Sequence, residues 1–124
     1  MGDEPTSRGR ISPCPDKPNC VSSLSEDKDC RIEPLGYSGD LDQARERILG
    51  ILKGVDRVKI VVSDKDYIHA EFRSALFRFV DDVQFYFPPG ENIVHMKSAS
   101  RTGYYDFGVN RKRIDWLREK FKNP

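Results

Sequence analysis

Residues 57–100 read RVKIVVSDKDYIHAEFRSALFRFVDDVQFYFPPGENIVHMKSAS, and apolar side chains recur along much of this stretch at every second position. Val58, Ile60 and Val62 share one parity, and residues 67–73 form the next run of this kind. A longer aromatic segment places five apolar residues on one parity: Phe77, Phe79, Val83, Phe85 and Phe87. A period of two residues is typical of β-strands that bury one face.

Turn signals separate these runs. Asp64-Lys65-Asp66 lies between the first two, and Pro88-Pro89-Gly90 precedes a further run at residues 92–98. Connections this short join antiparallel neighbours. The stretch therefore predicts an antiparallel sheet of four to five strands.

Helical patterns lie on both sides of the predicted sheet. Asp40 is a favourable N-cap, Gln43 follows it at capping-box spacing, and Gly54 suits the end of a helix. The apolar face of this first helix consists of Leu41, Ala44, Ile48, Ile51, Leu52 and Val55. A second helix is predicted from about Arg111 to Lys122, with Asn110 as a cap and Ile114, Leu117 and Phe121 as its buried stripe. Helices before and after an antiparallel meander predict a two-layer α+β domain.

The first 36 residues differ from the rest of the chain. They hold all three cysteines and five of the eight prolines, and no helical or strand period persists in them. We interpret them as a Pro/Cys-rich extended arm that precedes the sheet. Residues 1–12 are predicted to form a flexible tail, and residues 13–124 a single domain.

Composition excludes several classes of protein. The chain has 124 residues, 21 Lys and Arg against 20 Asp and Glu, and a net charge of +1. This balance argues against general nucleic-acid binding. The mean hydropathy is −0.65, and the longest aliphatic run, Ile60-Val61-Val62, is far too short to span a bilayer. No targeting segment is visible, which favours a cytoplasmic protein if the chain is complete as given.

Two cysteines lie six positions apart. Cys14 and Cys20 enclose two prolines and an asparagine, and such turn chemistry can bring two sulfurs within bonding range. We expect a structural disulfide here, with Cys30 left over. Buried inert thiols, or a reactive thiol or metal site, are the alternatives. A zinc site is disfavoured because the only histidines, His69 and His95, lie in predicted strands far along the chain.

An acidic pair, Asp81-Asp82, interrupts the aromatic strand. Adjacent strand residues point to opposite faces, so the two carboxylates do not form an acid/base pair unless a bulge re-aims one of them. Asp81 shares the parity of the phenylalanines, and an inward-facing Asp needs a partner, usually Arg. The acidic pair therefore has two interpretations. One is a structural ion pair or turn, and the other is a role in a functional site.

The segment between the last strand and the last helix is the most informative. Arg111, Lys112 and Arg113 occupy the predicted first turn, where positive charge opposes the helix dipole. Free backbone N–H groups, several cations and a Gly-containing loop together predict an anion site. Arg101, Ser98 and Ser100 add donors. The alternative is that these arginines form ion pairs with Asp81, Asp82, Glu71 or Asp106.

Charge is distributed unevenly along the chain. Residues 97–124 carry eight basic and three acidic side chains, a net charge of +5, whereas residues 1–96 carry −4. The C-terminal face is therefore expected to be basic. Without the charge excess and aromatic interleaving that nucleic-acid binding favours, a phosphate or carboxylate group is the better ligand.

Three blocks of this sequence resemble the domain of unknown function family 1499 (DUF1499): CPDKPNCVSS at 14–23, FRFVDD at 77–82, and SASRTGY at 98–104 with DFGVNRKRI at 106–114. The likeness covers about residues 12–120. It implies a single fold but no activity, cofactor or catalytic residue. Members resemble small bacterial and plastid proteins, sometimes with a signal, lipid anchor or membrane segment ahead of the domain. This implies a cell-envelope or periplasmic setting, which a Cys14–Cys20 bridge suits.

The leading hypothesis is a non-enzymatic binding domain without a cofactor. Its anion-accepting site would be built from Arg101, Arg111, Arg113, Ser98 and Ser100, with Asp81 and Asp82 orienting the arginines. One alternative is a small hydrolase or thiol enzyme that uses Asp81 or Asp82, or Cys14 or Cys20. The other is a protein-interaction or assembly module whose Pro-rich arm docks on a partner.

Overall fold

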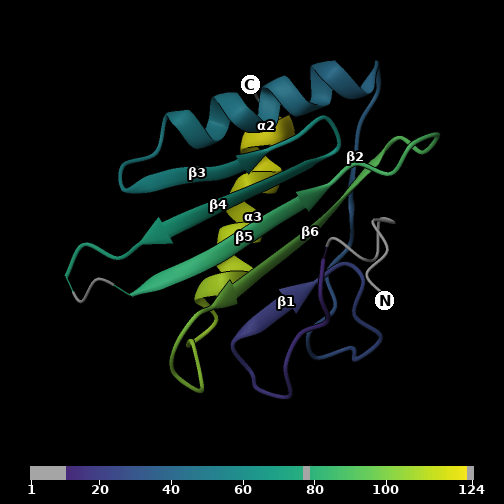
Figure 1. The fold of residues 1–124 in the computed structure, drawn as a ribbon. Coiled ribbons are helices and arrows are strands. Elements are labelled where there is room, and N and C mark those ends of the chain that lie inside the picture. Colours follow the sequence, from purple (N-terminus) through teal and green to yellow (C-terminus); the bar gives the residue numbers. More distant parts are fainter. Residues whose placement is uncertain (1–10, 77–78, 123–124) are drawn as a thin grey trace.

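A computed structural model describes residues 11–76 and 79–122 (Figure 1). Two helices pack on an antiparallel sheet, so the α+β prediction is confirmed. The strands are β1 (Cys20–Ser22), β2 (Leu35–Gly36), β3 (Val58–Ser63), β4 (Tyr67–Arg73), β5 (Val80–Tyr86) and β6 (Ile93–Ser100). The helices are α2 (Leu41–Lys53) and α3 (Val109–Lys122).

The four strands predicted from residues 57–100 form a continuous meander. The strand order in the sheet is β1-β6-β5-β4-β3, and β2 also pairs with β6. All pairings between these named strands are antiparallel. The predicted aromatic strand begins later than the alternation of apolar residues indicated. Strand β5 starts at Val80, and the Phe79 side chain before it is 58% exposed. Phe77 lies outside the described residues.

The N-terminal arm adds two short strands to the sheet. Cys20 lies opposite Ala99, and Leu35 lies opposite Val94, so both arm strands pair with β6. Strands of three and two residues carry no measurable period, which is why the sequence pattern did not indicate them.

The start of the described arm also packs on the sheet. Ile11 is buried in a small apolar cluster with Tyr67 and Tyr86. The ammonium group of Lys97 donates to the carbonyl oxygen of Ser12 at 2.8 Å. Residues 11 and 12, assigned to the tail by the sequence pattern, therefore contact the domain. The remaining tail residues lie outside the described part, and the division at residue 12 stays a prediction.

Helix α2 begins as its capping residues predict. The backbone N–H of Gln43 donates to the Asp40 carboxylate at 2.8 Å, and the Gln43 side chain accepts from the Asp40 N–H at 3.1 Å. The helix ends before Gly54, as predicted, although the φ of Gly54 is −89° and any residue could adopt it. Its buried residues are Ala44, Ile48, Leu49 and Leu52.

The core lies between the two helices and one face of the sheet. Ile68 and Ala70 from β4, Val83 and Phe85 from β5, and Met96 from β6 are fully buried on that face. Helix α3 covers them with the predicted stripe Ile114, Leu117 and Phe121. Its first turn therefore lies over the ends of β5 and β6, where the candidate site is found. None of the helices in the described ranges is long and apolar enough to cross a membrane.

Candidate functional site

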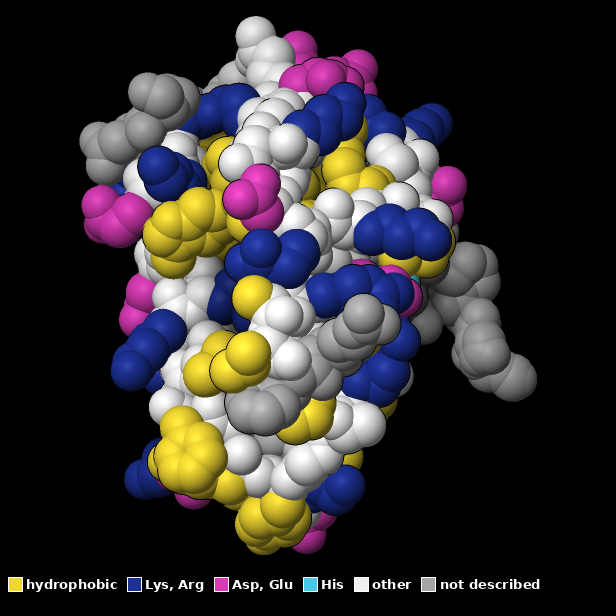
Figure 2. Space-filling model, turned by 90° about the vertical axis from the view of Figure 1, so that its left-hand side faces the viewer, with side chains coloured by type: hydrophobic (Ala, Val, Ile, Leu, Met, Phe, Trp, Pro, Cys, Tyr) yellow, Lys and Arg dark blue, Asp and Glu magenta, His cyan; other side chains and the backbone are white. Residues whose placement is uncertain are grey.

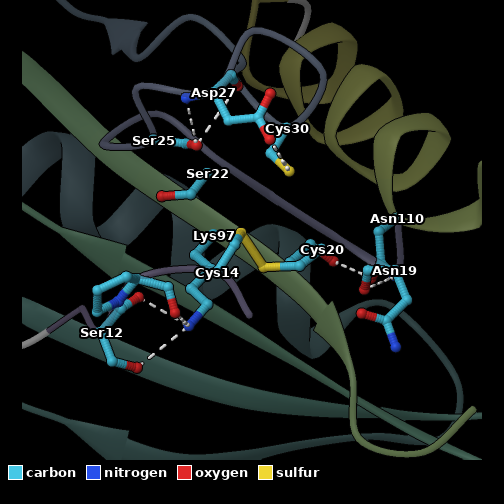
Figure 3. The surroundings of a disulfide bond; sticks show 12 residues. Ser12, Cys14, Asn19, Cys20, Ser22, Ser25, Asp27, Cys30, Lys97 and Asn110 are labelled. Atoms are coloured by element: carbon cyan, nitrogen blue, oxygen red, sulfur yellow. Dashed lines mark hydrogen bonds between the residues drawn. A yellow bond between two sulfur atoms is a disulfide. The ribbon is translucent and has the colours of Figure 1, made fainter. Parts of the chain in front are cut away.

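The arm is closed by a disulfide, as predicted. Cys14 and Cys20 are bonded, with their Cα atoms 5.7 Å apart (Figure 3). The bond joins two parts of the arm and lies beside β6. Cys30 is free and buried, and burial followed by the nearby Asp27 carboxylate raises the pKa of its thiol. Both effects suppress the thiolate, which is the reactive form of cysteine.

Asn110 is the centre of a buried polar network beneath the first turn of α3. Its side chain is fully buried, and its Oδ1 accepts from the Ser98 hydroxyl at 2.6 Å. Its Nδ2 donates to the carbonyl oxygen of Asn19 at 3.2 Å, and to Ser100 Oγ at 2.9 Å. The network therefore ties the disulfide-linked arm and strand β6 to helix α3.

Asp106, rather than Asn110, caps helix α3. The Asp106 carboxylate accepts from the backbone N–H of Gly108 at 2.9 Å and of Asn110 at 3.0 Å. The helix starts at Val109, two residues before the predicted start, so Asn110 lies inside the first turn. Burial alone would raise the pKa of the Asp106 carboxyl. The hydrogen bonds from Asn110 and Gly108 outweigh burial and hold the pKa below its usual value.

Arg113 forms a largely buried ion pair with Asp81. Its Nη2 lies 2.8 Å from Asp81 Oδ2, and the two side chains are 14% and 15% exposed. The guanidinium also donates to Asn110 Oδ1 at 2.8 Å and lies 4.8 Å from the centre of the Phe72 ring. The charge of one of the three basic side chains in the first turn of α3 is therefore compensated within the fold.

Asp82 points to the other face of the sheet, as strand alternation predicts. It accepts from Arg101 Nη2 at 2.6 Å and lies 2.8 Å from His69 Nε2. Arg101 also pairs with Glu71 at 2.9 Å. Burial acts against the charged form of Asp82, but the Arg101 and His69 hydrogen bonds keep its pKa below the usual value. Arg101 and Asp82 are thus separated by the sheet from Asp81 and Arg113.

Arg111 points toward the arm. Its guanidinium donates to the carbonyl oxygens of Asp29 at 3.0 Å and Arg31 at 3.4 Å. The seven predicted binding residues are therefore not gathered in one place. Asp81, Ser98, Ser100 and Arg113 lie together at the junction of β6 and α3, whereas Arg101, Asp82 and Arg111 lie elsewhere.

A hollow of about 670 Å³ opens at this junction. It lies between the end of β4, residues Ser74 and Phe79, and the loop at 101–108. Its lining includes three of the predicted residues, Asp81, Ser100 and Arg113. It also includes Arg73, Phe79, Tyr105, Phe107 and Val109, which sequence reasoning did not assign to a site. The aromatic run Tyr104-Tyr105-Asp106-Phe107 in a predicted loop was the available signal, because large aromatic residues in loops lack a core to bury them.

Phe107 stands out at the mouth of the hollow. Its side chain is 77% exposed, and its backbone φ is +57°, in the left-handed region that bulky residues avoid. The Tyr105 ring lies 4.9 Å away in an edge-on arrangement. Strained backbone of this kind clusters at ligand clamps and other functional sites.

A family model described as "Protein of unknown function (DUF1499)" matches residues 10–121. The chain belongs to the DUF1499 family. The match spans the arm, the sheet and nearly all of α3, so the DUF1499 domain contains the whole hollow and the network beneath it. A search of curated proteins found no significant match.

Proposed function

We propose that this DUF1499 domain is a binding domain for a small amphipathic molecule, with an apolar body in the hollow and an acidic group at its rim. The observation that carries the proposal is the lining of the hollow. Large apolar side chains face open space there, with Phe79 58% and Phe107 77% exposed. Hollows of this volume, mostly apolar with a few polar groups, are typical of small-molecule sites.

The acidic group is assigned to the rim because of Arg73. Its side chain is 47% exposed, and its Nη2 lies 3.1 Å from the carboxylate of Glu71, whose side chain is 15% exposed. Glu71 also pairs with Arg101 at 2.9 Å, so its carboxylate keeps a cationic partner when Arg73 turns to a ligand. Arg73 therefore exchanges its partner for a ligand carboxylate or phosphate at low cost. Arg113 forms an ion pair with Asp81, so these two residues contribute no net charge to the lining of the hollow.

The enzyme hypotheses gain no support from this geometry. Asp81 and Asp82 lie on opposite faces of the sheet, and each is held by an arginine, so they do not act as a paired acid and base. Cys14 and Cys20 are bonded to each other, which leaves no thiolate at either position. The arrangement favours binding over nucleophilic or acid/base chemistry.

Calorimetric titration with decanoate and decanol tests the proposal. Both have the same apolar body, but only decanoate is acidic. We expect both to bind, with decanoate tighter, and Arg73→Gln to remove the difference. Phe79→Ser removes a side chain that lines the hollow and should weaken both ligands roughly tenfold, since burying a large apolar side chain contributes about 1.5–3 kcal/mol.

Leu76→Ser is the matched control. Leu76 lies three positions before Phe79 in the sequence and is 77% exposed, but it does not line the hollow. Ligand affinity should not change in this variant. Equal losses in Phe79→Ser and Leu76→Ser, or no binding of either probe, would contradict the proposal.

A further inference from the structure

Exposed apolar side chains are concentrated on one side of the molecule. Among the described residues eight large apolar side chains are exposed, and only Val61 lies apart from the others, on edge strand β3. The other seven lie at residues 76 and 79, in the loop at 101–108 and on α3. We call these seven the aromatic face: Leu76, Phe79, Tyr104, Tyr105, Phe107, Val109 and Trp116.

The three segments adjoin one another. Phe79, Tyr105, Phe107 and Val109 all line the hollow, so the two loops and the start of α3 surround one opening. Trp116 lies two turns beyond Val109 along α3, on the same flank of the helix. A grouping of exposed apolar residues on this scale marks an interaction surface rather than ordinary surface composition.

The loop that carries three of these side chains, Tyr104, Tyr105 and Phe107, is firmly anchored. Asp106 accepts two backbone N–H groups at its end, and the Asn19 side chain donates to the carbonyl oxygen of Gly103 at 2.7 Å. Phe107 is held outward on left-handed backbone between these anchors. The exposed rings are thus presented on a fixed base, which lowers the entropic cost of inserting them into a partner.

Basic side chains flank the aromatic face. Arg73 and Lys112 are exposed beside it, and the Lys120 ammonium lies 6.0 Å from the Trp116 ring. Figure 2 shows this side of the molecule, where hydrophobic groups lie among Lys and Arg side chains, with Asp and Glu side chains also in view. Of the two carboxylates that line the hollow, Asp81 pairs with Arg113 and Asp106 caps α3. The complementary partner is therefore apolar and anionic.

We propose that the aromatic face docks on an anionic lipid membrane. Aromatic rings at the headgroup level, aliphatic tips below them and cations beside phosphate groups are the features of interfacial membrane contact. The aliphatic members Leu76 and Val109 favour a bilayer over a single-stranded nucleic acid, because aliphatic side chains offer no surface for base stacking. Docking does not require a ligand in the hollow, but it turns the mouth of the hollow toward lipid.

Vesicle binding by the full chain tests the proposal. Vesicles of phosphatidylcholine with phosphatidylglycerol should bind the protein more tightly than vesicles of phosphatidylcholine alone, and added salt should reduce the difference. Trp116 is the only tryptophan of the chain, so intrinsic fluorescence reports directly on the aromatic face. Its emission should shift to shorter wavelength when the anionic vesicles are added.

Three variants separate docking from ligand binding. Leu76→Ser removes an apolar tip that does not line the hollow and should weaken vesicle binding roughly tenfold, with decanoate binding unchanged. Lys112→Gln should weaken binding to anionic vesicles about fivefold and leave binding to neutral vesicles unchanged. Val61→Ser, which changes an exposed aliphatic residue on β3, away from the aromatic face, should have no effect.

Three results would overturn the proposal. The first is equal binding to both kinds of vesicle, and the second is equal losses in Leu76→Ser and Val61→Ser. The third is a shift of the Trp116 emission in the absence of lipid, produced by raising the protein concentration or by adding single-stranded DNA. That last result would assign the face to a second copy of the chain or to a nucleic acid. Failure to bind decanoate, in contrast, would count against the proposed function and leave membrane docking standing.

Discussion

The sequence left two roles open for the arginines in the first turn of α3, ion pairing within the fold and binding of an anion. Replacing Arg113 by Gln tests the first role, and Arg111→Gln is the control. Both arginines belong to the same turn. Arg113 is 14% exposed and forms an ion pair with Asp81, whereas Arg111 is exposed and donates to two arm carbonyls. The substitution leaves the Asp81 carboxylate largely buried without its charged partner.

The magnitude follows from this burial. Breaking a fully buried ion pair by removing one partner costs about 3–5 kcal/mol, and the residual exposure of both groups places this pair at the lower end, about 3 kcal/mol. Loss of the contact with Asn110 Oδ1 adds to the effect in the same direction. Arg111→Gln breaks only exposed hydrogen bonds to backbone oxygens, so its cost should be below about 1 kcal/mol.

Equilibrium unfolding in urea measures the difference. With a slope of about 1–3 kcal/mol/M, a loss of 3 kcal/mol lowers the midpoint by roughly 1–3 M. The double variant Asp81→Leu with Arg113→Met should recover much of the loss, because a well-packed apolar pair often replaces a buried ion pair without cost. Equal midpoints for Arg113→Gln and Arg111→Gln, or strictly additive effects in the double variant, would refute the reasoning.

Two further predictions concern the disulfide and the dependence of stability on pH. Reduction of the Cys14–Cys20 bond, or the Cys14→Ser Cys20→Ser variant, should lower the free energy of unfolding by about 2 kcal/mol, which is the chain-entropy value for so short a loop. Urea unfolding with and without reductant measures this loss. The folded pKa values of Asp82 and Asp106 lie below their unfolded values, so their contribution is complete above about pH 4 and is lost as the pH falls through the folded values. As the pH is lowered below about 4, the urea concentration at the unfolding midpoint should therefore decrease. In Asp106→Asn this decrease should be less steep. An unchanged slope in that variant would show that Asp106 does not carry the effect.

The meander and the first helix were predictable because their signals are local. Alternation over residues 58–73 and the Asp40 and Gln43 cap specify the backbone without reference to the rest of the chain. The pairing of Cys14 with Cys20 was accessible for the same reason, since the turn between them contains two prolines. The arm strands were not predictable, because their partner β6 is remote in sequence and their length gives no period.

The candidate site was predicted only in part. Strand alternation correctly placed Asp81 and Asp82 on opposite faces. The same rule, applied to β6, would have separated Arg101 from Ser98 and Ser100, which have the other parity. The hollow could not be predicted from the sequence because it depends on how two connecting segments approach each other. A periodic sequence pattern carries no information on that approach. Whether the residues gathered there bind an anion stays a prediction.

The pairing of the arm with β6 has a consequence for how the chain is made. Cys20 leaves the ribosome about 80 residues before its strand partner Ala99, a wait of roughly 4–16 s at 5–20 residues per second. Throughout that interval Cys14 and Cys20 are both available, whereas the sheet edge that will receive them does not yet exist. Their bond therefore needs no guidance from the finished fold, and the arm can reach the sheet as a loop that is already closed. Cys30 emerges only ten residues after Cys20, and burial against the completed domain then withdraws it from exchange.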